Sequence, residues 1–181
     1  LVKAGVFGAA PPGGTAAPAP PNGSLGPDGP DLANLAAQPW HRSLHKQADA
    51  LLLVGTNPRW EASLVNARLR KRHLRGGFTA YSVGPRLDLT FPVENLGAGT
   101  ETLAAIMNGM HPVVPRLKAA KHPMVIVGQG ALARPDGAAV LHAARRIAEE
   151  WDATKGEWNG FNVLHTAASR VGGLDVGFVP A

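Results

Sequence analysis

A glycine-containing turn directly after the first apolar run is the segment of this sequence best suited to ligand binding. The turn is Gly55-Thr56-Asn57-Pro58, and the run before it ends at Val54. In open α/β sheets, ligands bind beyond the carboxyl ends of the strands, where helix N-termini offer free N–H groups to anions. Glycine and Asn-Pro are equally ordinary residues for leaving a strand. The turn therefore predicts either a nucleotide site or a plain connection, and its spacing alone favours the connection.

Two further glycine pairs precede expected helices. Gly128-Gln129-Gly130 follows an apolar run, but Ala133 stands where a dinucleotide-binding fingerprint has its third glycine. Gly97-Ala98-Gly99 has no clear strand before it. We predict that both pairs are loops.

The densest group of charges is a basic cluster between residues 68 and 75. Its members are Arg68, Arg70, Lys71, Arg72, His73 and Arg75. At 3.6 residues per turn, these side chains spread over more than one face of a helix, so some must point at solvent or a partner. A nucleic-acid site would also need aromatic side chains for stacking, and only Trp60 is expected on the same helix. The cluster favours a solvated face or a protein contact.

The sequence lacks the residue sets of most catalytic and metal centres. It contains no cysteine, which excludes disulfides, thiol nucleophiles and cysteine-ligated iron–sulfur clusters. His41 and His45 have the spacing of metal ligands on one helical turn, but no third ligand accompanies them. Neither a nucleophile elbow nor a P-loop nor a defined pair of carboxylates is present. We predict no catalytic, cofactor-binding or metal-binding residue in this chain.

Charge and hydropathy set the class of protein. The 181 residues include 18 Lys and Arg against 13 Asp and Glu, which gives a net charge of +5. A basic chain favours acidic partners, whether nucleic acid, anionic lipid or an acidic protein surface. No apolar run approaches the roughly 20 residues that span a bilayer, and the first residues lack the layout of a signal peptide. These features predict a soluble chain.

Residues 1–39 differ in composition from the rest of the chain. Half of the 16 prolines lie there, mixed with glycine and alanine. Proline removes backbone donors and glycine raises the entropy cost of ordering, so this stretch is not expected to pack a core of its own. We predict an extended linker or, alternatively, a docking arm that wraps a neighbour. Residues 40–181 then form the folded domain.

Short apolar runs alternate with helical patterns from residue 48 onward. Strands are expected at 48–54, 78–83 and 123–127, and helices at 60–75, 100–107, 137–151 and 162–171. Thr100 and Asp136 are plausible N-caps for two of these helices. This alternation predicts an α/β fold, a parallel sheet with crossover helices. Three strands leave exposed sheet edges, so we expect further strands to come from another chain.

Several blocks of the sequence resemble one family. They are ADALLLVGTNPRWEA (48–62), NARLRK (66–71), DLT (88–90), LG (96–97), AAKHPMV (119–125), DGAA (136–139) and NVLH (162–165). In this order and spacing they resemble the 75-kDa, or G-type, iron–sulfur subunit of respiratory complex I, the NADH:quinone oxidoreductase. The resemblance covers about residues 45–180, and the first block is the most specific.

The resemblance implies a Rossmann-like, molybdopterin-oxidoreductase-like fold that is incomplete on its own. The family's subunit joins iron–sulfur domains to a C-terminal region related to molybdopterin-dependent oxidoreductases, and this sequence resembles part of that region. In the molybdenum enzymes the turn that matches residues 55–58 helps to bind the pterin dinucleotide, whereas the complex I relatives keep the fold without the cofactor. Arg59-Trp60-Glu61 places bulky side chains after the turn, consistent with a filled site.

The implied function is that of a non-catalytic structural component of the peripheral arm of complex I, as a split or partial subunit. Its expected partners are other peripheral-arm subunits, above all the chain that carries the iron–sulfur domains. Iron–sulfur clusters and FMN are expected in those partners, with no nucleic acid and no membrane insertion. The expected location is the matrix side of the mitochondrial inner membrane, or the cytoplasmic side of a bacterial one. Two alternatives stay open: an oxidoreductase domain that binds a pterin or nucleotide, and a basic nucleic-acid-binding module.

Overall fold

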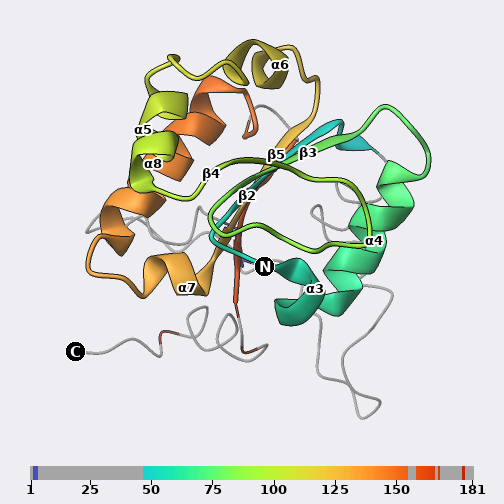
Figure 1. Ribbon diagram of the computed structural model, residues 1–181, viewed down its shortest axis with the longest axis horizontal. Coiled ribbons are helices and arrows are strands. Elements are labelled where there is room, and N and C mark those ends of the chain that lie inside the picture. Colours follow the sequence, from blue (N-terminus) through green and yellow to red (C-terminus); the bar gives the residue numbers. More distant parts are fainter. Residues whose placement is uncertain (1, 4–46, 155–157, 166, 168–176, 178–181) are drawn as a thin grey trace, which may run out of the picture.

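The computed structural model describes residues 2–3, 47–154, 158–165, 167 and 177 (Figure 1). Its strands are β1 (Val2–Lys3), β2 (Ala50–Val54), β3 (Thr79–Val83), β4 (Glu94–Gly97), β5 (Pro123–Gly128) and β6 (Phe161–Leu164). Its helices are α3 (Pro58–Glu61), α4 (Ser63–His73), α5 (Thr100–Met107), α6 (Val114–Lys118), α7 (Gln129–Leu132) and α8 (Gly137–Glu150).

The strands form one sheet in the order β1-β6-β5-β2-β3-β4. Strands β2 to β6 run parallel, and β1 pairs with β6 in the antiparallel sense. The chain passes from β2 to β3 and β4 on one side, then returns to place β5 and β6 on the other side of β2. The strand order therefore reverses between β2 and β5, which is where doubly wound sheets bind ligands. The predicted α/β fold with a parallel sheet is confirmed.

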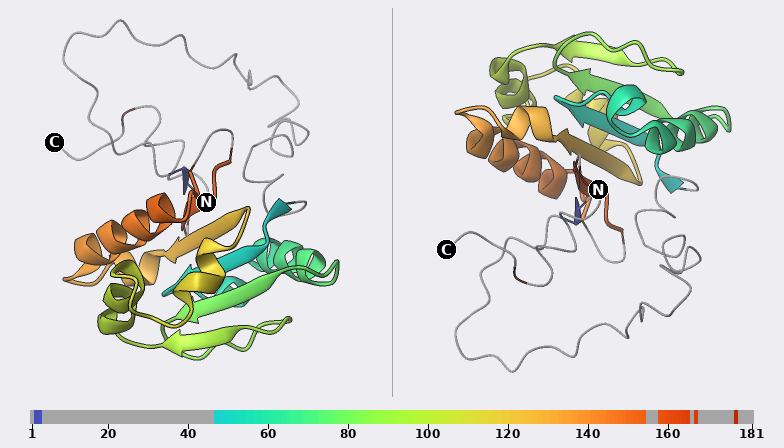
Figure 2. Two further views of the ribbon diagram at one scale, coloured as in Figure 1. Left: turned by 90° about the horizontal axis from the view of Figure 1, so that it is seen from above. Right: turned by 90° about the horizontal axis from the view of Figure 1, so that it is seen from below.

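The central strands are apolar along their whole length because helices cover both faces of the sheet (Figure 2). Leu51 and Leu53 of β2 lie in a core cluster with Leu69 of α4. The alternating residue Leu52 lies in a second cluster with Ile147 of α8 and with residues of α5 and α6. Every residue of β2 and β5 is buried.

Polar contacts hold β2 and β5 together at their amino ends. The Asp49 carboxylate accepts hydrogen bonds from the backbone N–H groups of Lys121, at 2.7 Å, and His122, at 2.9 Å. The Trp158 indole donates to the carbonyl oxygen of Pro123 at 2.8 Å. The Asp49 bonds join the start of β2 to the segment before β5, and the Trp158 bond joins β5 to the segment before β6.

Two predictions about strands, their number and the element at 162–171, are wrong. The sequence indicated three strands, but the described residues also supply β1, β4 and β6 to the sheet. The expectation that another chain adds further strands stays a prediction. The helix predicted at 162–171 begins instead as strand β6, and all four residues of that strand are buried. Residues 166 and 168–171 lie outside the described part of the chain.

Three of the predicted helices form near their expected positions, with changes at their ends. The helix predicted at 60–75 is divided at Ala62, whose φ of −153° and ψ of 73° are not helical, into α3 and α4. The helix predicted at 137–151 is α8, and Val140, Ala144, Ile147 and Trp151 form its buried side. Gly99 is the N-cap of α5, so Thr100 is the first helical residue and not its cap. Asp136 occupies the N-cap position of α8 but its side chain makes no capping bond.

Residues 1–39 lie outside the described part of the chain, apart from Val2 and Lys3 in β1. The choice between linker and docking arm stays a prediction. Among the described residues, no helix has the length and the apolar character that a membrane crossing requires.

The central position of β2 predicts a large difference between two leucine truncations. Leu52→Ala removes a side chain with 0% exposure and should lower the free energy of unfolding by about 2–5 kcal/mol. Leu64→Ala removes one with 73% exposure and should change it by less than about 0.5 kcal/mol. Urea denaturation of the full chain measures both. Equal effects would contradict the burial of β2 on both faces.

Candidate functional site

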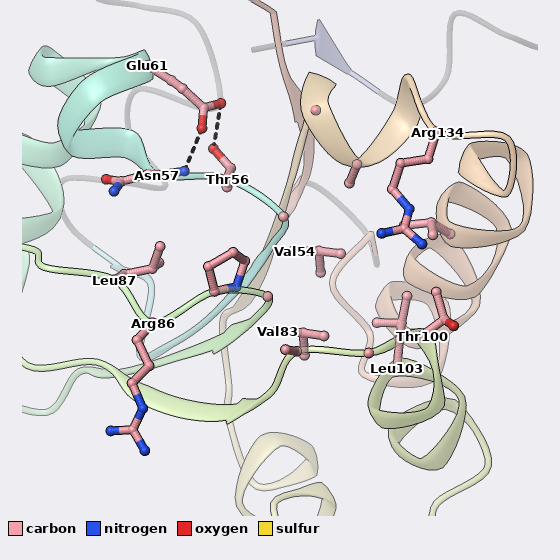
Figure 3. Close-up of a pocket in the computed structure, with 18 residues that line it drawn as sticks. Val54, Thr56, Asn57, Glu61, Val83, Arg86, Leu87, Thr100, Leu103 and Arg134 are labelled. Atoms are coloured by element: carbon pink, nitrogen blue, oxygen red, sulfur yellow. Dashed lines mark hydrogen bonds between the residues drawn. The ribbon is translucent and has the colours of Figure 1, made fainter.

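A cleft of about 450 Å³ lies at the carboxyl ends of β2 and β3 (Figure 3). All three glycine-containing segments singled out in the sequence contribute to its wall, through Gly55, Gly99 and Gly130. Gly97-Ala98-Gly99 begins at the last residue of β4, a strand that the sequence pattern did not predict. The structure therefore brings the separately predicted loops together at one place.

The turn after β2 uses its polar groups inside the chain. The Glu61 carboxylate accepts a hydrogen bond from the Asn57 N–H at 2.6 Å and another from the Thr56 hydroxyl at 3.0 Å. Asn57 in turn accepts the Arg59 N–H at its side-chain oxygen, at 3.1 Å, as the N-cap of α3. Figure 3 shows Glu61 bending back over the turn to reach both partners. This is a reciprocal cap: the Asn57 side chain satisfies the N–H of Arg59, and the Glu61 side chain satisfies the N–H of Asn57.

The reciprocal cap decides whether the turn fits an anion. The three donors just named are taken, and Pro58 carries no N–H. A phosphate at this turn would also meet the negative charge of Glu61 at close range. The residues of this turn therefore do not fit a phosphate-bearing ligand.

Bulky residues follow the turn, as noted in the sequence, but their side chains have different roles. Of Arg59, Trp60 and Glu61, only Glu61 lines the cleft. Trp60 is 79% exposed, and Arg59 pairs with Asp88 at 2.6 Å. A partial signal was available, because Glu61 lies in the first turn of α3, four residues after the Asn57 N-cap and one position beyond that of the acidic residue in a capping box.

Backbone packing closes the point where the strand order reverses. Gly55 has a φ of +55°, and a Cβ added there would lie 2.5 Å from the Cβ of Ala131 in α7. A Cβ on Gly128 would lie 2.4 Å from the carbonyl oxygen of Gly55. The loops after β2 and β5 thus touch each other directly. Both glycines are required by this close approach.

Two arginines lie at the cleft, and the sequence did not single out either. Arg134 forms a bidentate pair with Asp136, at 2.7 and 2.9 Å. This hydrogen bonding raises the pKa of Arg134 and lowers the pKa of Asp136, so both groups stay ionised and the charge of Arg134 is matched within the chain. Arg86 is exposed, and its side chain extends away from the cleft (Figure 3).

The basic cluster divides between the two sides of α4. His73 turns inward and stacks on Phe91, with ring centroids 6.2 Å apart. Arg72 donates to the carbonyl oxygens of Gly76 and Gly77, and Arg70 donates to that of Thr90.

The other three cations of the cluster differ in their exposure. Partial burial lowers the pKa of Arg68, while Lys71 and Arg75 are exposed. The prediction that the cluster spreads over more than one face is confirmed.

The described residues contain no group of three or more His, Cys, Asp or Glu side chains that could hold a metal ion. His41 and His45 lie outside the described part of the chain. The prediction that no residue of the chain is catalytic stays a prediction.

Known proteins are similar to this chain over most of its length. The model of the molybdopterin oxidoreductase family matches residues 29–181. The chain is 44% identical over 132 residues to the NADH-ubiquinone oxidoreductase 75 kDa subunit of Reclinomonas americana, covering 73% of this chain and 19% of that protein. It is 44% identical over 135 residues to the mitochondrial NADH dehydrogenase [ubiquinone] iron-sulfur protein 1 of Solanum tuberosum, covering 75% and 18%.

A bacterial relative gives the same result. The G-type subunit of the NADH-quinone oxidoreductase of Rickettsia conorii is 38% identical over 133 residues, covering 74% of this chain and 20% of that protein. The resemblance predicted from the sequence blocks is confirmed. The chain spans about a fifth of the length of the curated relatives that it matches.

The close approach of the β2 and β5 loops predicts opposite outcomes for two neighbouring substitutions. Gly128→Ala forces a Cβ against the Gly55 carbonyl and should lower the free energy of unfolding by about 1–3 kcal/mol. Gly130→Ala meets no atom within 4 Å and lies in α7, so it should be neutral or stabilising by up to about 1 kcal/mol. Thermal and urea unfolding measure both. Destabilisation by Gly130→Ala alone would refute this packing.

The reciprocal cap predicts a local effect of Glu61→Ala. Loss of the two hydrogen bonds should lower the free energy of unfolding by about 0.5–2 kcal/mol. The Asn57 amide should also exchange its hydrogen faster, as measured by hydrogen-exchange mass spectrometry or NMR. Glu101→Ala, in the first turn of α5, is the matched control and should leave Asn57 unchanged. Unaltered exchange at Asn57 in Glu61→Ala would mean that the carboxylate does not close the turn.

Proposed function

The chain belongs to the molybdopterin oxidoreductase family, and on this premise we propose that it is a non-catalytic structural component of the peripheral arm of respiratory complex I. Its relatives are named as 75 kDa or G-type subunits of NADH-ubiquinone or NADH-quinone oxidoreductases. In this role the chain packs against the iron–sulfur domains of a neighbouring polypeptide. It excludes water from them and keeps them at a fixed separation.

The observation that carries this proposal is the turn closed by Glu61. A pterin dinucleotide presents phosphates, and the family's binding turn here holds a carboxylate on its own donors. The chain also has no thiolate to hold a conventional iron–sulfur cluster. Both facts support a role as scaffold. The clusters and the FMN then belong to partner subunits.

The proposed location follows from the relatives. One is described as mitochondrial and another is bacterial. We favour the matrix side of the mitochondrial inner membrane, with the cytoplasmic side of a bacterial inner membrane as the alternative. The proposed chain contacts other peripheral-arm subunits and neither enters the membrane nor binds nucleic acid.

One observation favours a second candidate, an oxidoreductase domain that binds a pterin or nucleotide. The cleft of about 450 Å³ lies at the carboxyl ends of β2 and β3, the edge of the sheet at which open α/β folds bind ligands. Against it, Glu61 occupies the donors of the turn, and Asp136 neutralises Arg134. A ligand in this cleft would have to bind without the donors of the turn and without the charge of Arg134.

Two measurements on the full chain separate these functions. A tagged chain, expressed in cells of its source, should migrate with NADH dehydrogenase activity on a native gel. The chain purified alone should contain only substoichiometric iron and molybdenum by elemental analysis, and no pterin by fluorescence after oxidation. Stoichiometric molybdenum with a pterin, or NADH-oxidising activity of the isolated chain, would overturn the structural role.

A further inference from the structure

An apolar stripe lies on the outside of α3 and α4. Among the described residues, the large apolar side chains with the greatest exposure are Trp60 at 79%, Leu64 and Met110 at 73%, and Leu74 at 71%. Three of these four lie on α3, on α4 or directly after α4. Single exposed leucines need no explanation, but a contiguous group of them marks an interaction site.

Helix periodicity places this stripe opposite the core. Val65 and Leu69 bury one side of α4 against the sheet. With about 100° per residue, Leu64, Lys71 and Arg75 fall within a narrow arc on the opposite side, and Ala67 and Leu74 lie beside them. Trp60 lies on α3, the short helix directly before α4. We call these six residues the α4 outer face: Trp60, Leu64, Ala67, Lys71, Leu74 and Arg75. Both views in Figure 2 show α4 at the periphery of the described domain.

The charges of the α4 outer face have one sign. Helix α4 has the sequence SLVNARLRKRH and carries no acidic residue. Lys71 and Arg75 stand beside the exposed leucines. The Arg59 guanidinium, which pairs with Asp88, lies 5.8 Å from the centre of the Trp60 ring. The nearby carboxylate of Glu61 is already bound to the turn. Cations near the carboxyl end of a helix stabilise its dipole, but this does not account for the exposed leucines between them.

We propose that the α4 outer face docks onto a protein surface in which carboxylates surround an apolar groove. This inference rests on the proposed function and names the face through which the chain meets a neighbouring subunit. Leu64 and Leu74 enter the groove, Lys71 and Arg75 meet the carboxylates at its rim, and Trp60 with Arg59 provides an anchor. Tryptophan and arginine are the residues that most often dominate the energy of such interfaces.

The side chains favour protein over the other acidic surfaces. A single-stranded nucleic acid needs flat rings on which its bases can stack, and the centre of this face is aliphatic. Interfacial membrane helices bury a broad apolar face with cations on the opposite side. Here the cations and the leucines share one narrow face, which suits a groove with a charged rim.

Charge-introducing variants of the full chain test this surface in the assembled complex. Leu64→Glu should reduce the amount of chain that migrates with NADH dehydrogenase activity by at least about tenfold, at low and high salt alike. The double variant Lys71→Glu with Arg75→Glu should reduce it mainly at low salt, because rim charges act through screened electrostatics. Met110→Glu is the matched control, since Met110 is 73% exposed but lies away from α4, and should have no effect.

The same experiment separates the failure of this inference from that of the proposed function. If the unmodified chain never migrates with the activity, the proposed function fails. If it does and Leu64→Glu migrates equally well, only the docking surface fails. Thermal unfolding of each variant tests whether the domain stays folded, and we expect it to because the substituted side chains are exposed.

Photo-crosslinking from position 64 identifies the occupant. A benzophenone amino acid in place of Leu64 should capture a peptide rich in Asp and Glu from another subunit of the complex. Crosslinks to this same chain, to lipid or to nucleic acid would each refute a protein groove. The absence of any crosslink from an assembled complex would also refute a protein groove.

Discussion

Two hydrogen bonds to the Glu61 carboxylate, from the Asn57 N–H and the Thr56 hydroxyl, determine what the carboxyl end of the central strand can do. They convert a turn of the kind that receives anions into a closed cap that starts α3. Helix α4 follows α3 after Ala62 and packs on the sheet through Val65 and Leu69. The cap therefore closes the turn at the start of the segment that carries the basic cluster.

The rest of the fold is consistent with a rigid body more than with a binding protein. Gly55 and Gly128 bring the loops after β2 and β5 into direct contact, where a doubly wound sheet that binds a dinucleotide separates them. The Asp49 carboxylate, directly before β2, accepts hydrogen bonds from backbone N–H groups directly before β5, so it joins the amino ends of the two strands. With both ends fixed and both faces buried, the central strands have little freedom to open. Such stiffness is what a subunit needs if it is to hold a neighbour at constant distance.

Burial decided which parts of this fold could be predicted from the sequence. Strands β2, β3 and β5 are buried on nearly every residue, which leaves continuous apolar runs that are easy to recognise. Strand β4 is a half-exposed edge whose residues, Glu94–Gly97, have no strand pattern. Strand β6 is buried but includes Asn162, and its four residues were too short a run to separate from a helix. Glu61 and Arg134 bind partners within five residues in the sequence, but their place at one cleft depends on the fold and could not be read from spacing.

The distribution of charge connects the closed turn with the proposed docking surface. At the cleft, Arg134 is matched by Asp136 and the turn carries the negative charge of Glu61, so little positive potential remains there to attract an anionic ligand. Helix α4 itself contains cations and no acidic residue. Cations thus gather on α4, beside the exposed Leu64 and Leu74. An outward-facing helix surface of this kind is complementary to the acidic groove that we propose, and its charges would steer the encounter before the apolar contacts form.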